Sequence, residues 1–225
     1  MKYYKNIWLV EVPQYILVIF VILQFISMLT YSSGTFFDPL NHGYSFTRNF
    51  LSDLGRTESF SGNINFISCQ IFNLSLIMAG CVFVMYFINV HNIFVLHKYY
   101  KLAYLGSILG IMAGIALISV GMTPSDLYLS QHVFSAKWLF RCFFGSSVCY
   151  SIIIIRSNIF ENKYAIGYIF FAFSIFSYII LSELGPDPKE SELALIFQVI
   201  SQKIILLVLI SAVFLQTIGL KKLRH

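Results

Sequence analysis

Several side chains that could carry chemistry gather in three short segments that separate long apolar runs. Residues 33–65 contain Asp53 within the stretch LSDLG, and residues 122–132 contain Asp126 and His132. Carboxylates beside an imidazole could act as acid and base, or could hold a metal ion that activates water. We therefore treat Asp53, Asp126 and His132 as candidate catalytic residues.

Other polar side chains interrupt the apolar runs, where each is costly in lipid and needs a partner or a cavity. Lys137 and Arg141 are four residues apart and share a helix face, as do Gln198 and Gln202. These residues form either a ligand pocket or a set of helix-joining amides and cations that reach the lipid headgroups. The candidate pocket residues are Arg48, Asn49, Ser52, Asp53, Asn73, Asp126, His132, Lys137, Arg141, Glu183, Gln198, Gln202 and Lys203.

The sequence supports a metal or cofactor site less strongly than it supports a polar pocket. His42, Asp53, Asp126 and His132 offer ligand types that zinc accepts, but they follow no fixed ligand spacing such as HExxH. A divalent metal therefore stays an open alternative. Haem is not expected, because paired histidines in facing helices are missing.

The composition indicates a membrane protein. Hydrophobic residues make up 58% of the chain and charged residues 11%, with a mean hydropathy of +0.77, against roughly 25% charged residues in soluble domains. Six apolar segments are long enough to span a bilayer as helices. We predict an all-α transmembrane bundle in a single domain, with helices near 13–32, 66–90, 101–121, 133–155, 164–182 and 195–219.

Basic residues predict the orientation. Nine Lys and Arg residues lie on the side of the two termini and the even-numbered connections, and six lie on the opposite side. The excess predicts that both termini are cytoplasmic in a bacterial cytoplasmic membrane. Eight of the ten acids fall on the opposite, outer side. The first, third and fifth connections (33–65, 122–132, 183–194) emerge there together, so we expect them to form one polar pocket.

Two further expectations concern packing. Partly buried charges need partners, so we expect Asp53 or Asp126 to pair with Arg48, Lys137, Arg141 or Lys203. Gly106, Gly110 and Gly114 are spaced four apart on one helix face, a pattern typical of close helix packing, and this face could also join two chains. In LSDLG and the similar LSELG (181–185), we expect the glycine to adopt a left-handed conformation.

Three stretches carry a resemblance to a known family: FFDPLNHGYSFTRNFLSDLGRTES, NINFISCQIFNLSLIMAG and VGMTPSDLYLSQHVFSA. They resemble the six-helix bacterial and archaeal membrane proteins of the domain of unknown function 998 family. The chain is also distantly similar to the Frag1/DRAM/Sfk1 membrane proteins, and more loosely to ceramidase-like hydrolases that hold zinc with three histidines. The first resemblance implies the topology and names no reaction.

The leading functional prediction is a membrane protein whose outer pocket binds a lipid headgroup or another small polar ligand. A membrane-embedded lipid hydrolase, with or without a metal, is the alternative, and a small-solute transporter is a further one. A charged lid that only clamps the helix ends would use the same residue types. Nucleic acid is not an expected partner, since no recognition module is present and the basic excess suits anionic lipid.

Overall fold

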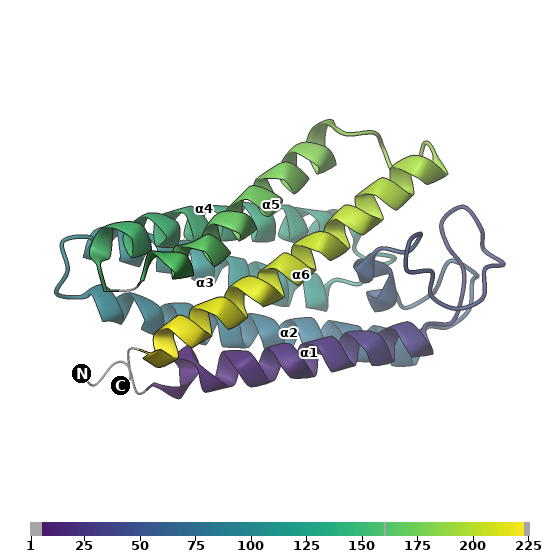
Figure 1. The fold of residues 1–225 in the computed structure, drawn as a ribbon. Helices are drawn as coiled ribbons and strands as arrows, with labels where there is room; N and C mark the ends of the chain where they lie inside the picture. Colours follow the sequence, from purple (N-terminus) through teal and green to yellow (C-terminus); the bar gives the residue numbers. More distant parts are fainter. Residues whose placement is uncertain (1–5, 160, 223–225) are drawn as a thin grey trace.

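The six apolar runs form six helices because a backbone crossing lipid must satisfy its hydrogen bonds internally. The computed structural model describes residues 6–159 and 161–222 (Figure 1). The helices are α1 (Glu11–Thr30), α2 (Phe66–Val90), α3 (Tyr100–Met122), α4 (Leu129–Ser157), α5 (Ala165–Leu184) and α6 (Glu192–Lys222). All six are long and apolar enough to cross a membrane. The predicted all-α, six-helix fold is confirmed.

The observed helices extend beyond the expected apolar ranges at several ends. α4 begins at Leu129 and α6 at Glu192, so both include a polar first turn that hydropathy alone leaves out. At α6, the Ser191 hydroxyl caps the helix by accepting a hydrogen bond from the Ala194 amide at 3.2 Å. The added turn of α4 places His132 on a helix.

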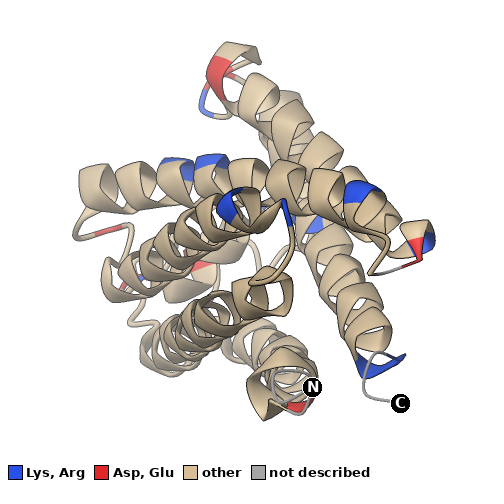
Figure 2. Ribbon diagram, turned by 90° about the vertical axis from the view of Figure 1, so that its left-hand side faces the viewer, with Lys and Arg blue, Asp and Glu red and all other residues tan. Residues whose placement is uncertain are grey.

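The two ends of the bundle differ in structure. The end that holds residues 31–65, 123–128 and 185–191 is called the loop end here, and the opposite end is the terminal end, where α1 begins and α6 finishes (Figure 1). In Figure 2, viewed toward the terminal end, most of the helix length carries no charged residue. Which end faces the cytoplasm stays a prediction.

α3 packs most extensively, between α2 and α4. A Cβ atom added at Gly110 would lie 2.3 Å from the Phe87 ring of α2, and one at Gly106 would lie 2.9 Å from Cys149 Cβ of α4. Gly114 faces Val84 of α2 in the same way. The glycine face is therefore filled by helices of the same chain, and an association of two chains stays a prediction.

α6 crosses the bundle diagonally and approaches α1 only near the terminal end (Figure 1). There, Gln14 Nε2 of α1 donates to Thr217 Oγ1 of α6 at 2.8 Å. Toward the loop end the two helices separate, and residues 31–65 are tied to α6 instead. Leu51 N donates to Gln202 Oε1 at 2.9 Å, so this long loop forms part of the bundle wall.

Candidate ligand-binding pocket at the loop end

A short 3-10 helix, η3 (Leu51–Gly55), organises the first loop. Asp53 starts it by accepting a hydrogen bond from the Phe50 amide at 2.8 Å. Gly55 ends it against α2, where an added Cβ would lie 2.5 Å from Asn73 Oδ1. Asn73 Nδ2 in turn donates to the Gly55 carbonyl at 3.1 Å. Asn73 thus anchors the loop.

The left-handed conformation expected for the glycines of LSDLG and LSELG is wrong. The glycines with positive φ in the described residues are Gly34, Gly43 and Gly62, and Gly185 has a φ of −78°. At Gly185, an added Cβ would lie 2.3 Å from the Leu181 carbonyl oxygen. Close approach of other atoms, rather than backbone strain, requires glycine at both positions.

A buried polar cluster joins this loop to α6. The Lys203 ammonium donates to the Asn49 carbonyl at 2.7 Å and lies 5.4 Å and 4.9 Å from the ring centroids of Tyr44 and Phe46. Lys203 is 6% exposed and Asn49 is fully buried. The Asn49 side chain also donates to Asp53 Oδ2 at 3.4 Å. Through these contacts, Lys203 holds the first loop against α6.

Burial raises the pKa of Asp53 to about 6. The Asn49 side chain, the Arg56 and Lys203 charges and the Phe50 amide favour the carboxylate and lower the pKa, but they do not offset the loss of solvent. Asp53 therefore exchanges a proton near neutral pH while it lines a cavity, a property that is common at functional sites.

Asp126 has a structural role in the third loop. Its carboxylate accepts hydrogen bonds from the Thr57 amide and the Glu58 amide at 3.0 Å and from the Thr57 hydroxyl at 2.5 Å. These donors favour the ionised form and hold the pKa of Asp126 below its usual value, against a desolvation effect that raises it. Asp126 thus connects the first and third loops and does not line the pocket.

The expected ion pairs of Asp53 and Asp126 are wrong. Among the described residues, the loop-end ion pairs join Arg48 to Glu192 and Arg141 to Glu183. Neutral donors supply the partners of both aspartates, because the loop backbone turns its amides toward them. Both ion pairs are partly exposed, so each contributes little stability, at most about 1 kcal/mol.

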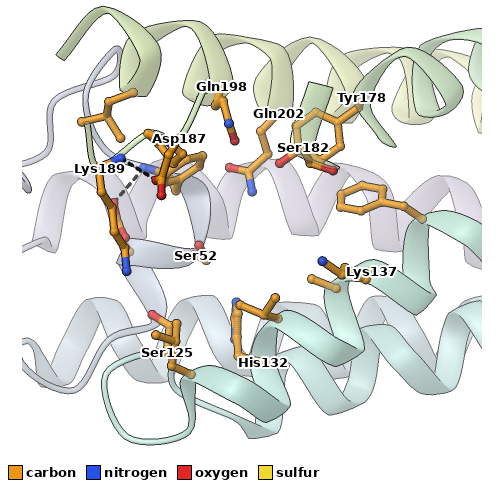
Figure 3. Close-up of a pocket in the computed structure, with 18 of the residues that line it drawn as sticks. Ser52, Ser125, His132, Lys137, Tyr178, Ser182, Asp187, Lys189, Gln198 and Gln202 are labelled. Atoms are coloured by element: carbon orange, nitrogen blue, oxygen red, sulfur yellow. Dashed lines mark hydrogen bonds between the residues drawn. The ribbon is translucent and has the colours of Figure 1, made fainter. Parts of the chain in front are cut away.

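A pocket of about 690 Å³ lies between the first loop, α4, α5 and α6. The third and fifth loops contribute Ser125, Asp187 and Lys189 to its wall. In Figure 3 the amides of Gln198 and Gln202 face His132 and Lys137 across the space. Gln198 Nε2 also donates to the Pro186 carbonyl at 2.8 Å, so it fixes the fifth loop at the rim.

Positive charge exceeds negative charge in this pocket. Four cations and three acids line it: Arg56, Lys137, Arg141, Lys189, Asp53, Glu183 and Asp187. Of the cations, Arg141 is paired with Glu183. The other three make no ion pair within the described residues. Arg56 is held at the rim, with its guanidinium carbon 4.2 Å from the centroid of the Phe60 ring.

The orientation of His132 determines what its ring can do. Nδ1 lies 2.7 Å from the Thr123 carbonyl oxygen. A carbonyl only accepts hydrogen bonds, so Nδ1 carries the proton, and in the neutral ring Nε2 is the acceptor. The ring is 8% exposed and lines the pocket. His132 can therefore accept a hydrogen bond or a proton from a bound molecule.

The pocket includes eight of the predicted residues: Ser52, Asp53, His132, Lys137, Arg141, Glu183, Gln198 and Gln202. Five others lie outside its wall: Arg48, Asn49, Asn73, Asp126 and Lys203. Six polar or charged pocket residues were not among the predicted pocket residues, namely Arg56, Ser125, Tyr178, Ser182, Asp187 and Lys189. Arg56 directly follows LSDLG, and this position shortly after Asp53 could have predicted that Arg56 lines the pocket. Nothing in the sequence distinguishes Tyr178 from other helix tyrosines.

The metal candidates do not assemble into a site. His42 is exposed on the first loop and does not line the pocket, and Asp126 is occupied by loop donors. Within residues 6–159 and 161–222, no three His, Cys, Asp or Glu side chains come together in a way that could hold a metal ion. The described residues therefore offer no metal centre built from three or more of these side chains.

The fold and the pocket define a multi-pass membrane protein with a cavity at one end of a six-helix bundle. Residues 25–215 match the family model described as "Protein of unknown function (DUF998)". The chain belongs to this family. No curated protein and no solved structure matches it.

Proposed function

We propose that the loop-end pocket binds the anionic headgroup of a membrane lipid. The observation that carries this proposal is a set of three cations, Arg56, Lys137 and Lys189, that line one cavity and have no carboxylate partner among the described residues. A phosphate group would offer these three cations an anionic partner, which none of them has among the described residues. Gln202 and His132 could hydrogen-bond to the rest of the headgroup.

Lys137 gives the sharpest test. It lies about two turns into α4, a helix that is long and apolar enough to cross a membrane. Purified protein in detergent is titrated with dioleoylphosphatidylglycerol and with dioleoylphosphatidylcholine, which differ in headgroup charge, and binding is measured by native mass spectrometry. We expect the wild type to prefer the anionic lipid and Lys137→Ala to lose most of that preference.

The matched control is Lys101→Ala, which removes an exposed lysine in the first turn of α3 at the terminal end. This control should bind as the wild type does. Equal binding of the two lipids by the wild type, or equal loss in both variants, would refute headgroup binding at this pocket.

A lipid hydrolase is the second candidate, and one observation favours it. Ser52, Asp53 and His132 line the same pocket, so a nucleophile, an acid and a base face one space. No hydrogen bond joins His132 to either of the others in the described chain, and a bound lipid would have to bring them together. Release of fatty acid or headgroup from lipid vesicles, lost in His132→Ala, would establish this activity.

A transporter is not proposed, because all six helices run without interruption, whereas broken helices at the bilayer centre are typical of secondary transporters. We infer from the distribution of basic residues that the protein resides in the cytoplasmic membrane with its loop end outside. Reporter fusions at residue 222 and within residues 185–191 should report opposite sides.

A further inference from the structure

A second cavity, called the inner chamber here, lies among the helices next to the loop-end pocket. Its volume is about 140 Å³, and it is lined almost wholly by apolar side chains. All six helices contribute to its wall, through Phe20, Phe72, Leu117, Phe143, Phe171 and Leu206 among others. A helix bundle normally fills such a space with side chains, since voids forfeit packing contacts.

The loop-end pocket and the inner chamber adjoin each other. Ser52, His132, Ala136, Phe140 and Gln202 line both cavities. The small side chain of Ala136, on α4, stands at this junction because it lines both cavities. A single elongated molecule could therefore place a polar end among the cations and an apolar end among the helices.

Gln24 interrupts the apolar wall of the inner chamber. Its side chain is 4% exposed, and its Oε1 atom has no hydrogen-bond partner among the described residues. Its Nε2 atom donates to Ser75 Oγ at 2.8 Å. A hydrocarbon chain offers no donor to Oε1, so the apolar wall and its connection to the cationic pocket, rather than Gln24, indicate the occupant.

A groove on the membrane-facing side gives a route for a lipid. It measures about 470 Å³ and lies between α5 and α6. It shares Tyr178 and Gly185 with the loop-end pocket, and Ile205 with the inner chamber. This shared lining favours a ligand that enters from the bilayer over one that enters from water.

We propose that the inner chamber holds one hydrocarbon chain of the same lipid whose anionic headgroup occupies the loop-end pocket. This inference rests on the proposed function, because it assigns the headgroup to that pocket. The ligand class is then an anionic amphiphile, held with a chain inside the protein. Lipid tails are as apolar as the chamber wall, so the chain is retained by shape and packing rather than by removal from water.

The test compares two probes that share a phosphate group: 1-oleoyl lysophosphatidic acid, which has one long chain, and glycerol 3-phosphate, which has none. Ala136→Phe fills the junction of the two cavities. We expect this variant to bind the long-chain probe about tenfold more weakly than the wild type, and to lose much less of its affinity for glycerol 3-phosphate. Val148→Phe, which enlarges an exposed residue of the same helix, is the matched control.

The outcomes separate the two proposals. Wild-type affinity of Ala136→Phe for the long-chain probe, together with weak binding by Lys137→Ala, would overturn the inner chamber as the chain site and keep the headgroup site. Wild-type binding by Lys137→Ala would overturn both.

A measurement on the wild type guards against misfolding of the variant. A lysophosphatidic acid with a photoactivatable diazirine at the chain end should label chamber residues such as Phe143 or Leu117. Labelling confined to lipid-facing residues of α5, such as Phe170 and Phe173, would contradict the inference.

Discussion

Lys203 offers a quantitative test of how the first loop is held. Its ammonium group is buried, donates to the Asn49 carbonyl at 2.7 Å and lies over the rings of Tyr44 and Phe46. It also lowers the pKa of the buried Asp53 carboxyl. Lys203→Met keeps the length and the apolar stem of the side chain and removes the charge.

The expected loss can be worked out from these contacts. A hydrogen bond from a charged donor contributes about 1.5–3 kcal/mol, and two cation–π contacts add about 0.5–1 kcal/mol each. Methionine avoids the desolvation of the ammonium group, which offsets part of the loss. The Asn49 carbonyl keeps a hydrogen bond from Tyr44 Oη at 3.1 Å. We expect Lys203→Met to lower the free energy of unfolding by about 3 kcal/mol.

Denaturant unfolding in detergent micelles measures this change. Lys221→Met, an exposed substitution in the last turn of α6, is the control and should unfold as the wild type does. Adding Asp53→Asn to Lys203→Met should restore part of the loss, because the variant then buries no unpaired carboxylate. If Lys203→Met and the control unfold at the same denaturant concentration, the buried cluster does not hold the loop.

Three further predictions follow from single side chains. Burial raises the pKa of Asp53 to about 6, so the wild type should lose about 3 kcal/mol of stability relative to Asp53→Asn as the pH rises from about 4 to about 6. Unfolding of both proteins measured as a function of pH checks this prediction. A difference in unfolding free energy that stays constant with pH would contradict it. Gly110→Ala should lower stability by about 1–3 kcal/mol, since the new Cβ atom would meet the Phe87 ring. Gly145→Ala should lower stability less, because only the end of the Leu109 side chain must move. Thermal unfolding of the two variants checks this order. Gln24→Leu should leave stability unchanged or raise it in lipid-free protein, because the unpartnered acceptor disappears; a loss above about 2 kcal/mol would show that Oε1 has a partner.

The sequence by itself determines the membrane class and the six helices. Bilayer thickness sets the length of a spanning helix, and the apolar runs match that length whatever the tertiary contacts are. Because successive spanning helices alternate in direction, the first, third and fifth connections lie at one end. This topology alone was enough to predict that the polar connections meet at the loop end.

Only the tertiary structure decided which polar residues face the cavity. Asp53 and Asp126 look alike in sequence, each following a serine in a loop, yet Asp53 lines the pocket and Asp126 binds the amides of Thr57 and Glu58. Lys137 and Lys203 likewise differ in role, although each interrupts an apolar helix. The inner chamber left no mark in the sequence, because the same apolar residues would have filled a closed core. Such roles depend on helix rotation and loop path, which long-range packing sets and local residue patterns do not encode.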